Sequence, residues 1–258
     1  MNVTDVKQII CMKWGSLYGA EYVNRLYAMV RYCTQGPIRF VCLTDDVQGI
    51  RPEVECLDCP SINLPMPHCL RPWRKVNLFS ESAGLFGFSG DWLFLDLDVV
   101  ITGSMDCFFT YKPQESFVVM QNWTQKGKGI GNTSVYRFRV GADSYILNDL
   151  LEDPEGVISQ YRNSQTYISK NIKALNFWPE DWCVLFKVQC LPPWPRRFWV
   201  APTCPPTARV VAFPGEPNPH QAVKGRWPVK RWFKRVYKFT KPASWIQEQW
   251  DQAESAIK

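Results

Sequence analysis

The stretch Trp92-Leu-Phe-Leu-Asp-Leu-Asp-Val-Val-Ile101 decides the fold of this chain. Asp96 and Asp98 interrupt an apolar run of the kind that forms a buried parallel strand. Because the interior of a strand is a poor place for anions, the carboxylates predict its carboxyl end, the edge where open α/β sheets bind ligands. Asp-x-Asp there can hold a divalent cation and leave positions for phosphate oxygens. We expect a metal–diphosphate site; the alternative is a pair of solvated or capping aspartates.

The segments around this strand repeat a strand–helix pattern. Residues 9–14 and 39–44 are apolar runs that predict strands, and residues 20–33 between them carry an apolar stripe at helical spacing. Strand, helix and strand in this order form a βαβ unit, which implies a parallel sheet. The stretch 92–101 is expected to be one strand, and further strands are expected at 116–120, 134–138 and 209–213. Further helices are expected at 73–86, 143–151 and 165–175.

Length and charge predict one large domain followed by a short basic tail. A chain of 258 residues suits one large α/β domain, which we place at residues 1–225, with a basic, aromatic tail at 226–258. The segment 224–241 contains eight cations and no acid, so it accounts for the whole formal net charge of +6.

Targeting signals are lacking in the sequence itself. No stretch is apolar enough for a transmembrane helix, and the first residues do not join a basic region to an apolar one. We therefore expect a cytoplasmic protein whose ten cysteines are reduced. Cys56 and Cys59 have no second pair to complete a zinc site, so packing explains them better.

Several motifs in order resemble the GT-A class of nucleotide-sugar glycosyltransferases, in particular the glycogenin-like and lipopolysaccharide galactosyltransferase group. The motifs span roughly residues 9 to 222 and are Trp14-Gly15, Leu43-Thr-Asp-Asp46, the Asp96-Leu97-Asp98 strand, Asn132-Thr-Ser-Val135, Gln165-Thr-Tyr-Ile-Ser169 and Phe213-Pro-Gly-Glu-Pro-Asn-Pro-His220. The resemblance implies a Rossmann-like GT-A fold, with a mostly parallel central sheet flanked by helices.

The same resemblance assigns roles around the nucleotide. Asp96 would lie near the ribose and the metal, and Asp98 would be the firmer ligand of Mn²⁺ or Mg²⁺. Lys13, Trp14 and Gly15 would contact the base and ribose of the donor. Asp45 would lie on the same rim, although turn formation after a strand explains it equally well.

Three further residues fall where the family places polar groups near the donor sugar. Lys75 stands where a basic residue often faces the phosphate or sugar, the alternative being a solvated charge. Asn132 corresponds to a polar side chain near the bound sugars. Gln165 matches the Gln of an Asp-Gln pair, but Ser164 replaces the Asp, which removes a carboxylate.

The C-terminal motif departs from the family pattern. The family's His-x-x-Gly-x-x-Lys-Pro-Trp places its His on the metal and its Lys on phosphate. Here Gly215 matches the Gly, while Ala212 and Asn218 stand at the His and Lys positions. His220, Lys224 and Arg226 are candidate replacements for these contacts, with His220 as the ligand of the metal; for His220 a structural loop histidine is the alternative.

The predicted function is transfer of a hexose from a nucleotide diphosphate sugar to a hydroxyl of a glycan or lipid-linked glycan, and the resemblance alone favours UDP as the nucleotide. A binding protein of the same fold without catalysis, and a nucleotidyltransferase, are the alternatives. No recognised nucleic-acid module accompanies the tail, so we expect no nucleic-acid partner. Its segment 226–241 is expected to form a helix from Val229 that binds an anionic membrane, at the inner face, the alternative being a solvated basic appendage.

Overall fold

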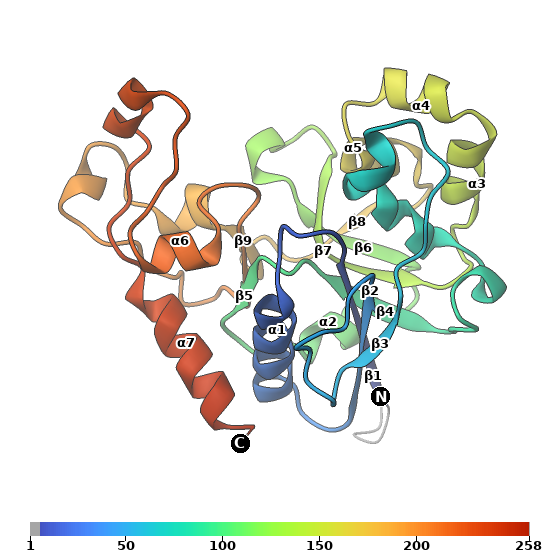
Figure 1. Cartoon of the computed structure of the whole chain (residues 1–258), viewed down its shortest axis with the longest axis horizontal. Coiled ribbons are helices and arrows are strands. Elements are labelled where there is room, and N and C mark those ends of the chain that lie inside the picture. Colours follow the sequence, from blue (N-terminus) through green and yellow to red (C-terminus); the bar gives the residue numbers. More distant parts are fainter. Residues whose placement is uncertain (1–5, 258) are drawn as a thin grey trace.

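A seven-stranded sheet runs through the middle of the molecule, in a computed structural model that describes residues 6–257 (Figure 1). In spatial order its strands are β3 (Glu55–Asp58), β2 (Ile38–Thr44), β1 (Lys7–Lys13), β4 (Asp91–Leu95), β7 (Gly131–Arg139), β6 (Phe117–Gln121) and β8 (Asn176–Phe177). Four of the six neighbouring pairs are parallel, and the two that involve β7 are antiparallel with β4 and β6. The predicted mostly parallel sheet is confirmed.

Helices cover both faces of this sheet. On one face lie α1 (Ala20–Cys33) and α7 (Ser244–Ser255), and on the other lie α3 (Tyr145–Glu152) and α5 (Ser164–Asn171). The short helices are α2 (Cys107–Thr110), α4 (Pro154–Gln160) and α6 (Pro219–Val223). Alternate residues of β4 enter the two cores, Leu93 and Leu95 on the α1 side and Phe94 on the α3 side. Such two-sided burial explains why β4 is apolar throughout.

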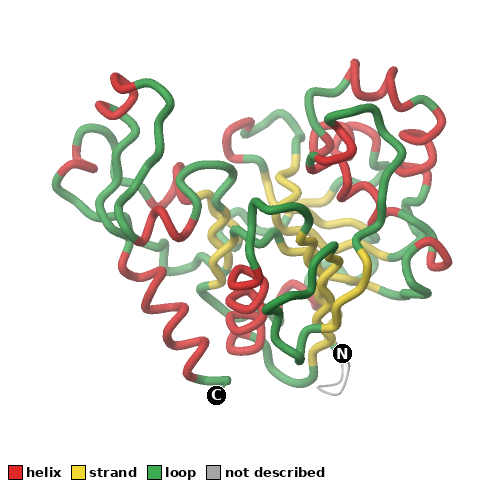
Figure 2. The backbone as a smooth tube through the Cα atoms, viewed as in Figure 1, coloured by secondary structure: helices red, strands yellow, loops and turns green. Residues whose placement is uncertain are grey.

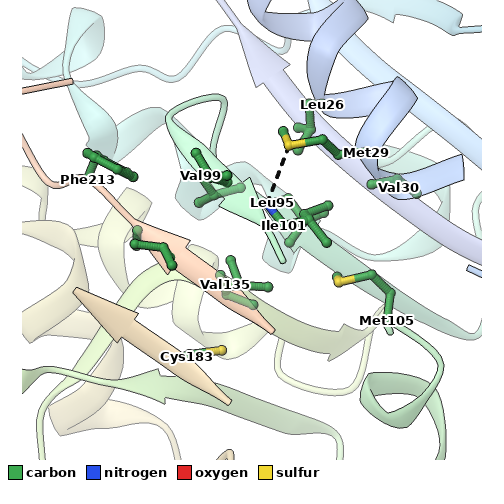
Figure 3. Packing of buried hydrophobic residues seen from close by; sticks show 14 of the residues in the cluster. Leu26, Met29, Val30, Leu95, Val99, Ile101, Met105, Val135, Cys183 and Phe213 are labelled. Atoms are coloured by element: carbon green, nitrogen blue, oxygen red, sulfur yellow. Dashed lines mark hydrogen bonds between the residues drawn. The ribbon is translucent and has the colours of Figure 1, made fainter. Parts of the chain in front are cut away.

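The stretch expected to form one strand at 92–101 is divided between two sheets. β4 ends at Leu95, and β5 (Val99–Ile101) pairs instead with β10 (Val210–Ala212), which in turn pairs with β9 (Cys183–Leu185). Figure 3 shows this packing, in which the backbone N–H of Ile101 contacts Sδ of Met29 on α1. The apolar run did not reveal the break because both halves are fully buried.

The expected helix at 73–86 is a pair of 3₁₀ segments, Pro72–Phe79 and Ser82–Gly84. Trp73 and every residue from Lys75 to Phe79 are buried, so the segment has no solvent-facing side such as an amphipathic α-helix needs. α4 was not predicted; Pro154 at its first turn and the Asp153 side chain, which accepts from the N–H of Gly156, start it.

The segment 226–241 forms a projection together with residues 191–200, and we call these two segments the basic–aromatic lobe. Figure 2 shows that it is mostly loop. The expected helix from Val229 is wrong: only a five-residue 3₁₀ turn forms, at Trp232–Val236. Cations four residues apart, such as Lys230 and Lys234, repel one another on an α-helix and disfavour it. The lobe ends before α7, which packs on α1 and buries Ile246 and Trp250.

Among residues 6–257, no helix combines the length and the apolar character that a bilayer crossing requires.

Candidate functional site

The two aspartates lie at the junction of the two sheets. Asp96 directly follows β4, and its backbone N–H donates to the carbonyl of Ser134 on β7 at 2.9 Å. Asp98 directly precedes β5. Because β1, β2 and β4 are parallel, their carboxyl ends meet at this same edge, and the antiparallel β7 begins there. The predicted position of the carboxylates at a strand end is confirmed.

Asp98 is nearly enclosed, with 9% of its surface exposed. Burial, and then the negative charge of Asp96, raise the pKa of its carboxyl to about 7. The hydroxyl of Tyr18, in the loop between β1 and α1, donates to Oδ2 of Asp98 at 2.9 Å. Burial and the charge of Asp98 in turn raise the pKa of Tyr18. A cation bound here would relieve the repulsion that disfavours two adjacent anions.

Asp96 has a positive partner already. The ammonium of Lys75, in the 3₁₀ segment Pro72–Phe79, forms an ion pair with Oδ1 of Asp96. Lys75 is only 7% exposed, so it is not the solvated charge that was its alternative reading. Its Nζ also lies 5.2 Å from the ring centroid of Phe94. The structure thus places a buried cation directly beside the first carboxylate of the pair.

The loop after β1 is tied to the loop after β2. Gly15 has φ +63°, and its N–H donates to Oδ2 of Asp45 at 2.9 Å. The Trp14 indole N–H donates to the carbonyl of Leu70 at 2.9 Å. Lys13 is buried at the end of β1 and donates to the carbonyl of Asp46 at 3.0 Å. These residues share one rim, while their contact with a nucleotide stays a prediction.

Asn132 and Gln165 approach the same edge from the other side. Asn132 lies near the start of β7 and is buried, and its side chain accepts from the N–H of Ser134 at 2.9 Å. The half-buried Gln165 is on the first turn of α5. Ser169 joins the two elements, because its hydroxyl donates to the carbonyl of Gln165 and accepts from the N–H of Gly131. The Ser164 hydroxyl lies 3.3 Å from the carbonyl of Pro72.

The loop after β10 carries the departures from the family motif. Ala212 is fully buried between Leu185 of β9 and Val99 of β5. Gly215 has φ +68°. Asn218 caps α6, its side chain accepting from the N–H of Gln221 at 3.0 Å. The buried methyl group of Ala212 cannot bind a metal, and Asn218 lacks the positive charge that the Lys of the family pattern brings to phosphate.

His220 on α6 is enclosed by aromatic rings and a cation. Its ring lies 4.4 Å from that of Tyr22 and 4.9 Å from that of Trp250, and Arg25 contacts its Nε2. Burial, and then the charge of Arg25, lower the pKa of His220 to about 4. A guanidinium beside the ring opposes binding of a metal ion, so these surroundings favour the structural alternative for His220.

The chemistry of the site fits a divalent cation held by few protein ligands. Among residues 6–257, no three His, Cys, Asp or Glu side chains converge on one point. Asp96 and Asp98 nevertheless offer adjacent carboxylates, and Mg²⁺-type sites commonly use one or two carboxylates together with substrate phosphates. The pair therefore fits a metal that a diphosphate completes.

Comparison with known proteins gives matches in structure alone. No protein-family model and no curated protein sequence matches the chain. The galactosyltransferase LgtC, solved with donor and acceptor sugar analogs, is similar with a TM-score of 0.57 and 13% identity over 94% of this chain and 99% of LgtC. An active-site mutant of LgtC gives 0.54 and 13% over 92% and 98%.

The glycosyltransferase GlyE of Streptococcus pneumoniae TIGR4 is also similar, with a TM-score of 0.56 and 12% identity over 96% of this chain. The chain spans 60% of the length of GlyE. The predicted GT-A glycosyltransferase fold is confirmed by these similarities.

Sequence reasoning found most of this edge and missed two of its residues. Tyr18 is a single aromatic residue in a loop, and nothing in the local sequence connects it with Asp98. Lys187, which follows β9, donates to the carbonyls of Pro214 and Glu216 in the loop after β10. Lys187 comes shortly after β9, a strand of only three residues, and so short a strand shows no recognisable periodicity in the sequence.

Proposed function

We propose that this protein is a glycosyltransferase that moves a hexose from a nucleotide diphosphate sugar, UDP being favoured, to a hydroxyl of a glycan or lipid-linked glycan. The observation that carries the proposal is the pair Asp96 and Asp98 at the carboxyl edge of a GT-A sheet, with buried Lys75 beside it. Anions are costly to bury without a partner. Such an arrangement suits a site whose ligand brings a cation.

The residues at this edge would have separate roles in binding the metal, the diphosphate and the nucleoside. Asp96 and Asp98 would hold Mn²⁺ or Mg²⁺, which when bound stabilises the negative charge that develops on a leaving diphosphate. Lys75 holds Asp96 in place and keeps one positive charge in the site. Lys13, Trp14, Gly15 and Asp45 would bind the nucleoside on the rim formed by the loops after β1 and β2.

The sugar would lie toward β7 and α5. Asn132 offers an amide, and Gln165 offers a half-buried side chain on α5, the helix that contacts β7 and the 3₁₀ segment carrying Lys75. Orienting the sugar between such polar groups lowers the entropic part of the barrier. Because Ser164 stands in place of a carboxylate, we assign the contact with the sugar to the amide of Gln165.

A thermal-shift panel tests the nucleotide. A ligand that binds only the folded state raises the melting temperature by mass action. We expect UDP or a UDP-sugar with Mn²⁺ to raise it, and chelation by EDTA to abolish the rise. Stabilisation by a nucleoside triphosphate instead would favour the nucleotidyltransferase alternative.

Catalysis is tested separately from binding, because Ala212 and Ser164 both replace polar residues of the family pattern. We expect slow release of free UDP from the stabilising UDP-sugar in the presence of Mn²⁺. A protein that binds the donor without releasing UDP, with or without sugar acceptors, would be a binding protein of the same fold.

We further propose that the basic–aromatic lobe binds the inner face of an anionic membrane, where a lipid-linked acceptor would be found. Large apolar side chains are exposed together on its two segments, namely Trp194, Trp199, Val200, Trp232, Phe233, Val236 and Tyr237. The Trp194 indole N–H donates to the carbonyl of Val236 at 3.1 Å, which joins the segments. Exposed aromatics among cations suit a lipid headgroup region.

Vesicle co-sedimentation tests the lobe. We expect binding to phosphatidylserine-containing vesicles that falls with added salt, and little binding to phosphatidylcholine alone. The double substitution Trp232→Ala and Phe233→Ala should reduce it, whereas Met66→Ala, at an exposed residue outside the lobe, should not. Equal binding to both kinds of vesicle would contradict the proposal.

A further inference from the structure

Lys187 is a partly buried cation held over the loop that follows β10. It lies in the turn Phe186–Cys190 after β9, and its ammonium donates to the carbonyls of Pro214 and Glu216, the latter at 3.2 Å. An ammonium group has three N–H donors. Two are used by these carbonyls, so one donor and the full positive charge are left for another acceptor.

The three-stranded sheet brings the turn that carries Lys187 to the same end as Asp98. Ala212 of β10 pairs with Val99 on one side and with Leu185 on the other. The residues at the next position are therefore Asp98, Phe213 and Phe186, and the rings of Phe186 and Phe213 stack at 4.6 Å. Two strand spacings amount to roughly 10 Å. A lysine side chain and a diphosphate bound at Asp98 can together cover that distance.

Charges from two directions act on Lys187. Burial, and then the positive charge of Lys238 in the basic–aromatic lobe, lower the pKa of Lys187, while Asp98 and Glu216 act in the opposite direction. The charges of Lys238 and of the buried Asp98 thus both act on Lys187. Repulsion between like charges such as those of the two lysines is relieved by an anion near them.

The residue at the family's phosphate-binding position is already engaged. Asn218 accepts from the N–H of Gln221, and the Gln221 side chain accepts in return from the N–H of Asn218 at 2.9 Å. An amide used in this capping box brings no positive charge to a phosphate. A diphosphate at Asp96 and Asp98 would lack a cation on the side of β10 unless another element supplied one.

We propose that Lys187 binds the diphosphate of the donor and supplies, from the turn after β9, the positive charge that Asn218 does not. This assignment rests on the proposed glycosyltransferase function. It makes Lys187 a second phosphate-binding cation, so that the leaving group would be held by partly buried Lys187, by buried Lys75 and by the metal carboxylates.

The test compares ligands with and without the diphosphate. Titration calorimetry with Mn²⁺ measures UDP, and saturation-transfer NMR measures uridine, for the wild type, Lys187→Gln and Lys187→Arg. Gln can still donate to the carbonyl of Pro214, so it removes the charge with little change to the loop. Lys173→Met is the matched control, since Lys173 is exposed beyond the far end of α5.

We expect Lys187→Gln to weaken UDP binding about 10- to 100-fold, as loss of a charged hydrogen bond does, and to leave uridine binding unchanged. Lys187→Arg should keep most of the UDP affinity, and Lys173→Met all of it. An equal loss for UDP and uridine, or unchanged UDP affinity in Lys187→Gln, would overturn the assignment while leaving the proposed function in place. A wild type that binds no UDP would overturn both.

Discussion

Replacing Asp98 with Asn should stabilise the metal-free protein at neutral and higher pH. Burial and the charge of Asp96 raise the pKa of Asp98 from its ordinary 3.8 to about 7 in the folded protein. Below pH 3.8 the carboxyl is protonated in both states and costs nothing. As the pH rises from 3.8 to 7 the unfolded chain ionises first, so the folded state loses stability, and the full loss persists above pH 7.

The size of the effect follows from the two pKa values. They differ by about 3, and each pH unit between them corresponds to about 1.4 kcal/mol, which sets an upper bound of about 4 kcal/mol. The Asn oxygen can still accept from the hydroxyl of Tyr18, so the substitution does not lose that hydrogen bond. Because polarisable surroundings weaken such effects, we expect a gain of about 2–4 kcal/mol at pH 8.

Urea unfolding in EDTA at pH 4 and pH 8 measures this gain, with unfolding followed by tryptophan fluorescence. The wild type and Asp98→Asn should differ by less than about 1 kcal/mol at pH 4, and the variant should be clearly more stable at pH 8. In Mn²⁺ with UDP the order should reverse, because only the wild type gains stability from the ligand. A variant that is less stable than the wild type at pH 8 without metal would refute the reasoning.

Three further changes test separate contacts of the site. Lys75→Met leaves Asp96 without its buried partner and should lower the free energy of unfolding by about 3 kcal/mol in urea at pH 7; an effect below 0.5 kcal/mol would mean that water replaces the pair. Gly15→Ala forces a side chain into the left-handed region at φ +63°, so it should lower the free energy of unfolding by about 1 kcal/mol and weaken UDP binding. If neither quantity changes, this turn does not bind the nucleotide. The pKa of His220 is lowered to about 4, so its contribution to stability is present above pH 6.5 and is lost as the pH falls toward 4; His220→Phe should flatten the fall in urea stability over this range, and parallel curves would contradict the assignment.

The strands and the carboxylate edge could be predicted because burial leaves a direct trace in sequence. β1, β2 and β4 are buried on both faces, so each is an apolar run, and Asp96 is the first residue that such a run cannot accommodate. The same signal failed at β5. Val99–Ile101 is as apolar as β4, and no Gly or Pro marks the change of sheet.

Contacts between distant segments left no such trace. Lys75 and Asp96 are separated by 21 residues, and Lys187 reaches the site only because β9 pairs with β10. The helix expected from Val229 had the right apolar spacing, but cations at i and i+4 opposed it. His220 looked like a ligand by residue type, and only the fold shows Arg25 against its ring.

The measurement that tests the central claim most directly is release of UDP from a panel of UDP-sugars by the wild type and Asp98→Asn, each with Mn²⁺ and with EDTA. We predict release by the wild type in Mn²⁺ alone, faster when the acceptor glycan is added, and none above background for Asp98→Asn in either condition. Equal release in EDTA, or by a folded Asp98→Asn, would contradict the assignment of Asp96 and Asp98 as the site where a metal and a nucleotide diphosphate sugar are bound.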